Sequence, residues 1–307
     1  MGKNKELKEL RQKIKKLSKD QKDLAQQLEQ LQQVLAFSDT SSGVPAPSIT
    51  ASAWTAIYPP PLERGKYSPR YAQYRVSNVQ QLTPTVIRVA GVPASELKAD
   101  IQGLLGEYIY VITGKSGEVL PEPRTEGKKP AWDQPISSTK YTVRQHNTET
   151  GELEINIVLH ERGAGTTWAR NVAVGDIMHV VGAKSGYRTG GAYDFYLMAG
   201  DETGLPGMAR WAEGLPKDAR GALFIEVPGT ASRQNLKLPP GVEVIWVDSL
   251  QVGALATAVQ GYPLPQGSIF AWLAGESTSL QPLRSWVRKE LKMPKGHGYS
   301  KGYWKRK

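Results

Sequence analysis

The sequence lacks cysteine altogether across its 307 residues. Disulfides, thiolate nucleophiles, cysteine-ligated zinc and iron–sulfur clusters are therefore excluded from this chain. Its four histidines (His146, His160, His179 and His297) are scattered and do not have the spacing of metal ligands. We therefore predict no resident metal site.

The sequence also lacks a run of about 18 apolar residues, the length that a membrane-spanning helix needs. We expect no membrane span. The first residues, Gly2-Lys3-Asn4-Lys5, lead into a charged segment and not into the apolar stretch of a signal peptide. With neither signal present, we expect a cytoplasmic protein.

Positive charge is unevenly distributed along the chain. The formal net charge is +10, of which residues 1–35 carry +4 and residues 284–307 carry +8, leaving −2 for the middle. A nucleic-acid-binding protein more often spreads its basic residues over a folded face with exposed aromatics between them. The distribution therefore does not favour nucleic-acid binding.

The N-terminal segment has a heptad repeat. Apolar side chains recur at the a and d positions over about four heptads, with Gln21 as the polar exception: Leu7, Leu10, Ile14, Leu17, Leu24, Leu28, Leu31 and Leu35. Because a single helix would leave these leucines in water, we predict a coiled-coil helix over 1–37 and a homo-oligomer formed through residues 7–35. Contact of its basic first half with an anionic surface is the alternative.

Composition and periodicity divide the rest of the chain into three parts. Residues 38–72 are rich in Ser, Gly and Pro and predict an extended linker, although its four aromatic residues are unusual in a free tether. Residues 73–190 contain six or so short alternating segments, which predict an antiparallel β-barrel. Residues 191–307 alternate apolar strands with helices and predict a parallel, nucleotide-binding α/β sheet.

Seven segments of this region, in order, resemble the siderophore-interacting proteins, which are FAD-containing ferric-siderophore reductases. They are "YTVR" (141–144), "GELEINIVLH" (151–160), "GAGTTWA" (163–169), "GDETGLPGMAR" (200–210), "FIEVPG" (224–229), "WLAGE" (272–276) and "GYWKR" (302–306). The resemblance runs from about Tyr74 to Lys307. It implies a ferredoxin reductase-like fold, in which a flavin-binding barrel precedes an NAD(P)-binding-like α/β domain.

The first segment resembles the strand that holds the flavin. The resemblance implies that the Tyr141 ring packs on the isoalloxazine, that the Thr142 region bonds its edge, and that Val143 and Arg144 complete the cofactor strand. The family arginine that pairs with the FAD pyrophosphate is replaced here by Thr139. A guanidinium gives phosphate two charge-assisted bonds, whereas a hydroxyl gives one neutral bond. Lys140 is no simple substitute, because neighbouring strand residues face opposite sides.

The second group of candidates resembles the pyrophosphate loop of the family. Gly165, Thr166 and Thr167 belong to it, and His160 precedes it. Glycines allow close backbone approach, and N–H groups at a helix start bind phosphate. An ordinary glycine turn is the alternative.

Acidic and hydroxyl residues end the predicted sheet strands, where open α/β sheets bind ligands. The resemblance implies that Asp201, Glu202 and Thr203 face the flavin and nicotinamide as catalytic residues, and that Glu276 contacts the cofactor. Glu226 ends another strand at the same edge. Helix capping is the alternative reading of these residues.

The C-terminal segment matches the ending of the family. There the resemblance implies that Tyr303 and Trp304 shield the flavin, while Lys301, Lys305 and Arg306 attract an anionic ferric siderophore. A solvated basic end is the alternative.

Together these features predict an FAD-dependent ferric-siderophore reductase. The resemblance implies that NAD(P)H or a ferredoxin supplies electrons and that iron leaves as Fe(II). Two other classes stay open: a family member with a degenerate flavin site that serves as a coiled-coil scaffold, and a flavin reductase with another acceptor. A nucleic-acid binder ranks last.

Overall fold

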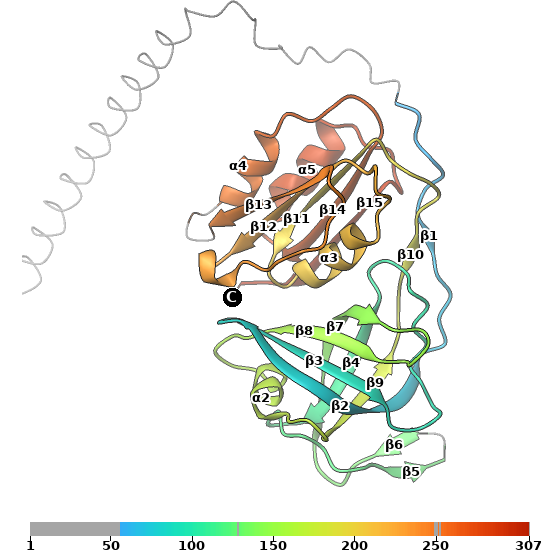
Figure 1. Ribbon diagram of the computed structural model, residues 1–307. Coiled ribbons are helices and arrows are strands. Elements are labelled where there is room, and N and C mark those ends of the chain that lie inside the picture. The colour runs from blue at the N-terminus through green and yellow to red at the C-terminus, as the bar shows by residue number, and fades with distance from the viewer. Residues whose placement is uncertain (1–55, 128, 249–250, 252, 307) are drawn as a thin grey trace, which may run out of the picture. The chain divides into compact units, whose positions relative to one another are not determined.

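The computed structural model describes residues 56–127, 129–248, 251 and 253–306 (Figure 1). The predicted coiled-coil helix and the first part of the predicted linker lie outside this range. The described chain forms a β-barrel followed by a five-stranded α/β sheet, as the sequence predicts. Among its helices, none is both long and apolar enough to cross a membrane.

Residues 56–69 form a strap, which belongs to the predicted linker but is held on both domains. Within it, β1 (Glu63–Arg64) pairs antiparallel with β10 (Tyr187–Arg188), and the two run side by side in Figure 1. The Leu62 N–H donates to the Gly296 carbonyl at 2.8 Å, and the Gly65 N–H donates to the Gly186 carbonyl at 2.8 Å. Tyr58 and Tyr67 of the predicted linker thus lie in an ordered segment, whereas Trp54 lies outside the described residues.

Six antiparallel strands close the barrel in the order β2-β3-β8-β7-β4-β9. Their bounds are β2 (Arg70–Thr83), β3 (Val86–Pro93), β4 (Tyr108–Gly114), β7 (Ile136–His146), β8 (Leu153–Val158) and β9 (Ile177–Gly182). The inward positions carry apolar side chains that are fully buried, including Tyr74, Ile109, Leu153 and Met178. A short hairpin, β5 (Arg124–Glu126) with β6 (Lys129–Ala131), lies between β4 and β7. Helix α2 (Ala164–Asn171) follows β8.

The second domain is a parallel sheet in the order β13-β12-β11-β14-β15. Its strands are β11 (Phe195–Asp201), β12 (Gly221–Val227), β13 (Val242–Asp248), β14 (Ile269–Glu276) and β15 (Gly298–Trp304). The connecting helices are α3 (Leu205–Glu213), η1 (Thr230–Ser232), α4 (Ala254–Gln260) and α5 (Gln281–Lys289). A parallel sheet covered on both faces needs near-continuous apolar strands, and every residue of the interior strand β14 is buried.

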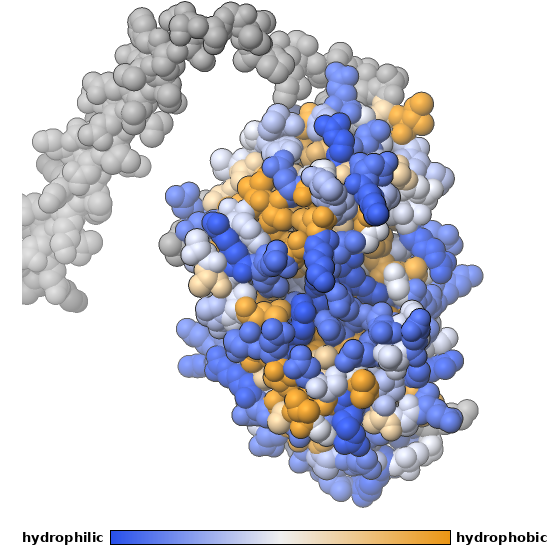
Figure 2. Space-filling view, viewed as in Figure 1, coloured by the Kyte–Doolittle hydropathy of each residue, from blue (hydrophilic) through white to orange (hydrophobic). Residues whose placement is uncertain are grey.

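The two faces of this sheet have separate cores. Tyr196 and Met198 of β11 pack with residues of α3, whereas Phe195 and Leu197 pack with residues of α4 and α5. This alternation follows from the two-residue period of a strand. The helices lie on the two sides of the sheet in Figure 1. The face seen in Figure 2 is largely hydrophilic, with apolar patches between the polar side chains.

Candidate functional site

Strand β7 and the start of α2 approach each other at three residues that the sequence predicts to bind the cofactor. A Cβ built on Gly165 would overlap the Tyr141 hydroxyl and would lie 3.1 Å from the Thr139 hydroxyl oxygen. Glycine at 165 therefore lets the strand and the helix approach closely. Burial raises the pKa of Tyr141, while a hydrogen bond with Thr139 acts in the opposite direction. The structure thus brings Thr139, Tyr141 and Gly165 together.

The start of α2 has neither a side-chain cap nor an acidic residue. Its N-cap residue Gly163 has φ 141°. The first N–H groups of a helix have no acceptor within the helix, and the helix dipole favours negative charge there. The Thr166 hydroxyl oxygen lies 3.1 Å from His160 Nδ1 and accepts from the His160 N–H at 3.3 Å. These contacts leave half-buried Thr167 as the less constrained hydroxyl.

Thr142 faces the C-terminal strand. Its hydroxyl is hydrogen-bonded with Tyr303, which is also bonded with Tyr299 and whose pKa is raised by burial. Tyr299 stacks on Trp272, with ring centroids 4.1 Å apart. Tyr303 of the C-terminal segment therefore contacts the Tyr-Thr strand at Thr142.

Asp201 joins three strand ends at the carboxyl edge of the sheet. Its Oδ2 accepts from Trp304 Nε1 at 2.9 Å and from the Glu276 N–H at 2.8 Å. Its Oδ1 accepts from the Thr203 N–H at 2.8 Å and from the Thr203 hydroxyl. These bonds form a turn that precedes α3, whereas no side chain caps α3 itself, so the contacts of Asp201 and Thr203 are not those of a helix cap. Trp304 is 42% exposed beside this group.

Glu202 is directed toward the barrel instead. Its Oε1 accepts from the Thr85 hydroxyl at 2.7 Å, and Ser232 of η1 also bonds this carboxyl group. Burial raises the pKa of Glu202. The residue thus connects the β2–β3 turn with the sheet, and its partners differ from those of Asp201 and Thr203.

Glu276 is a buried carboxylate that receives several backbone bonds. Burial opposes its ionisation, but N–H groups of Ser279, Thr278 and Arg306 bond it and hold the pKa of Glu276 at about 2. The Ser279 N–H donates at 2.6 Å and the Arg306 N–H at 3.1 Å. Glu276 therefore ties the C-terminal segment to the end of β14.

We expect the stabilising effect of Glu276 to depend on pH. Its folded-state pKa lies below its ordinary value of 4.5, so its contribution is present above pH 4.5 and is lost as the pH falls toward 2. Glu276→Gln should therefore lower the urea midpoint more at pH 7 than at about pH 3. The exposed Glu96→Gln is the control. An equal deficit at both pH values would contradict this assignment.

Ion pairs join the two domains at residues that the sequence did not single out. Arg210 of α3 donates to Glu107 Oε2 at 2.9 Å and to the Val143 carbonyl at 3.1 Å. Glu107 is fully buried and also accepts from the Tyr67 hydroxyl at 2.7 Å. The sequence feature that could have indicated Glu107 is its position as a charged residue at the start of the apolar segment "EYIYVIT".

The remaining basic candidates are distributed over different surfaces. Arg144 pairs with Glu213 of α3 at 2.8 Å, and Lys140 lies over the Tyr108 and Tyr110 rings. Lys140 therefore faces away from Thr139, as predicted. Lys301, Lys305 and Arg306 are exposed on and after β15.

Two family models match the described domains. Residues 75–186 match the siderophore-interacting FAD-binding domain, and residues 193–307 match the siderophore-interacting protein model. Ferric vibriobactin reductase ViuB of Vibrio cholerae is 30% identical over 210 residues, which cover 66% of this chain and 77% of that protein.

Solved structures agree with this similarity. A siderophore utilization protein from T. fusca aligns with a TM-score of 0.70 at 26% identity, covering 80% of this chain and 96% of that one. A ferredoxin reductase in carbazole 1,9a-dioxygenase aligns with a TM-score of 0.56 at 17% identity, covering 76% of this chain and 67% of that one. The latter shows the fold alone, and that fold is the ferredoxin reductase-like one predicted from the sequence.

Proposed function

Because the chain belongs to the siderophore-interacting protein family, we propose that it is an FAD-dependent reductase of ferric siderophores. The observation that carries the proposal is the close approach of Tyr141 and Thr139 to Gly165 at the uncapped start of α2. This arrangement places a helix start suited to phosphate beside a strand that offers an aromatic ring.

The residues present fit the pyrophosphate and the isoalloxazine of FAD. The N–H groups at the start of α2 would hold the pyrophosphate, with Thr167 as an added donor. The half-buried Tyr141 and Thr142 would contact the isoalloxazine. The one shortfall is the missing guanidinium at position 139. Bound FAD would supply the conversion between two-electron and one-electron transfer.

The C-terminal segment would cover the ring and guide the substrate. Tyr303 is bonded with Thr142, and Trp304 is fixed on Asp201. Both aromatic residues would limit the access of water to a bound flavin. The exposed Lys301, Lys305 and Arg306 would attract an anionic iron chelate. Reduction to Fe(II) then weakens the hold of hard oxygen ligands on the iron, with NAD(P)H or a ferredoxin as the electron source.

A second candidate function is a binding role without flavin chemistry, and Thr139 favours it. With a hydroxyl in place of the guanidinium, the site loses a charge-assisted pair with phosphate. The same fold would then serve as a scaffold that holds a siderophore or a partner protein.

The test is an FAD titration of the full chain followed by an electron-transfer assay. We expect FAD to bind and the loaded protein to consume NAD(P)H, or electrons from a reduced ferredoxin, with a ferric chelate. Capture of Fe(II) by a chromogenic chelator measures the product. Oxygen and quinones are the comparison acceptors, and faster reduction of these would indicate a different flavin reductase. Absence of FAD binding would exclude the reductase and favour the scaffold.

A further inference from the structure

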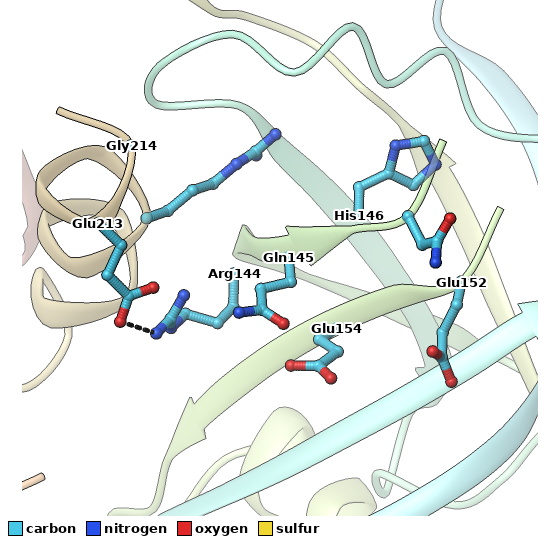
Figure 3. A pocket seen from close by; sticks show the side chains of 9 residues that line it. Arg144, Gln145, His146, Glu152, Glu154, Glu213 and Gly214 are labelled. Carbon is cyan, nitrogen blue, oxygen red and sulfur yellow. Dashed lines mark hydrogen bonds and ion pairs between the residues drawn. The ribbon is translucent and has the colours of Figure 1, made fainter. Parts of the chain in front are cut away.

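A polar cavity lies apart from the contacts between β7 and α2. It has a volume of about 430 Å³ and lies between the β7–β8 hairpin and the C-terminal end of α3 (Figure 3). Arg144, His146 and Glu154 line it from the barrel, and Glu213 and Gly214 line it from α3. The volume falls within the range of about 300–1,000 Å³ for small-molecule sites.

Three buried atoms of this cavity have no hydrogen-bond partner within the described part of the chain. They are Arg144 Nη1, His146 Nδ1 and Glu154 Oε2. Arg144 is only 5% exposed. Glu154 Oε2 has an ionic neighbour, Arg88 Nη1 at 3.5 Å, but no hydrogen bond. Leaving a buried donor or acceptor unpaired costs about 1–3 kcal/mol, so a polar ligand that reached these atoms would be favoured.

The other charges of the cavity are already engaged. Arg144 Nη2 donates to Glu213 at 2.8 Å, and Arg210 is held by Glu107 and the Val143 carbonyl. Glu152 Oε1 accepts from the Ser77 hydroxyl at 3.0 Å. The lining therefore carries both signs of charge in close proximity.

This mixture of charges restricts the chemistry of a ligand. A simple anion would be opposed by Glu152, Glu154 and Glu213, and a simple cation would be opposed by the two arginines. Burial, together with Arg210, lowers the pKa of His146 and favours a neutral imidazole. The C-terminal end of α3 also favours positive charge through the helix dipole.

We propose that this cavity binds a small zwitterion of the amino-acid class, with its carboxylate on Arg144 Nη1 and its ammonium group toward Glu154 Oε2. In Figure 3 the Gln145 side chain lies between those of Arg144 and Glu154. Gln145, Asn147 and Gly214 are exposed at the rim, which gives a ligand access from solvent. This inference is independent of flavin binding.

The test is calorimetric titration of the full chain with glycine, L-serine, L-glutamate and L-lysine, with acetate and methylammonium as single-charge probes. We expect at least one amino acid to bind about tenfold more tightly than either single-charge probe. Glu154→Gln and Arg144→Lys should each weaken that binding about tenfold, the loss expected for one charge-assisted bond. Arg144→Lys keeps the positive charge beside Glu213 but removes the second donor.

Glu149→Gln is the matched control, since Glu149 is exposed on the same hairpin and outside the lining. Circular dichroism and the unfolding midpoint show whether each variant is folded. Three outcomes would overturn the proposal: none of the four amino acids binds, acetate binds as tightly as the amino acids, or neither lining variant changes the affinity. An equal affinity for the amino acid in the presence and absence of FAD would support a site separate from the flavin site. Competition between FAD and the amino acid would contradict a separate site.

Discussion

Thr139→Arg is expected to tighten FAD binding about ten- to hundredfold. Thr139 lies on β7 beside Gly165, and its side chain faces the start of α2. An arginine at this position would reach the site proposed for the pyrophosphate and form a two-pronged, charge-assisted pair with it. Hydrogen bonds to charged groups contribute about 1.5–3 kcal/mol, and each 1.4 kcal/mol corresponds to about a factor of ten in affinity.

Lys140→Arg is the matched control for this experiment. Lys140 is adjacent in sequence, but its ammonium group lies over the Tyr108 and Tyr110 rings on the opposite side of the strand. An added guanidinium fork there should leave the dissociation constant of FAD unchanged. Fluorescence titration of both variants provides the comparison. Equal effects of the two variants would mean that general electrostatic attraction, and not the geometry at Thr139, controls affinity.

Glu107→Ala is expected to destabilise the protein by about 3–5 kcal/mol, the loss typical of removing one partner from a buried ion pair. Glu107 is fully buried and accepts from Arg210, from the Tyr67 hydroxyl and from the Gln102 N–H. Its loss would leave the Arg210 guanidinium without its carboxylate at the contact between the domains. The measurement is urea unfolding followed by tryptophan fluorescence.

Glu126→Ala is the surface comparison. Glu126 lies 3.9 Å from Arg124, and both side chains are more than half exposed. An exposed pair of this kind contributes about 0–1 kcal/mol. We also expect Glu107→Ala to separate unfolding into two transitions, because it weakens the connection between barrel and sheet. A single transition with an unchanged midpoint would show that Glu107 does not couple the domains.

Much of the fold could be predicted from local periodicity. Alternation in segments such as "EYIYVIT" indicated barrel strands, and the apolar segment "GSIFAWLAGE" indicated a buried parallel strand. A strand with one buried face alternates apolar and polar residues, whereas a strand buried on both faces is apolar throughout. The hairpin within 114–136 escaped prediction, because its strands are short and largely exposed.

The partners of individual polar residues could not be predicted in the same way. Glu107 and Arg210 are 103 positions apart, and Thr85 and Glu202 are 117 positions apart. Nothing local in the sequence specifies these pairs, since they depend on how the barrel meets the sheet. The motif "YTVR" indicated the strand correctly, but its register alone did not reveal that Arg144 turns toward α3.

The strap over residues 56–69 has a mechanical consequence. The chain passes between barrel and sheet twice, once through β10 and the residues that follow it and once through β1, and the two passages are hydrogen-bonded to each other. At Gly190, any side chain would overlap Pro60, so the passages are also closely packed. Two hydrogen-bonded segments resist a rotation of the barrel relative to the sheet more than a single flexible linker would. The barrel and the sheet should therefore keep a constant spacing.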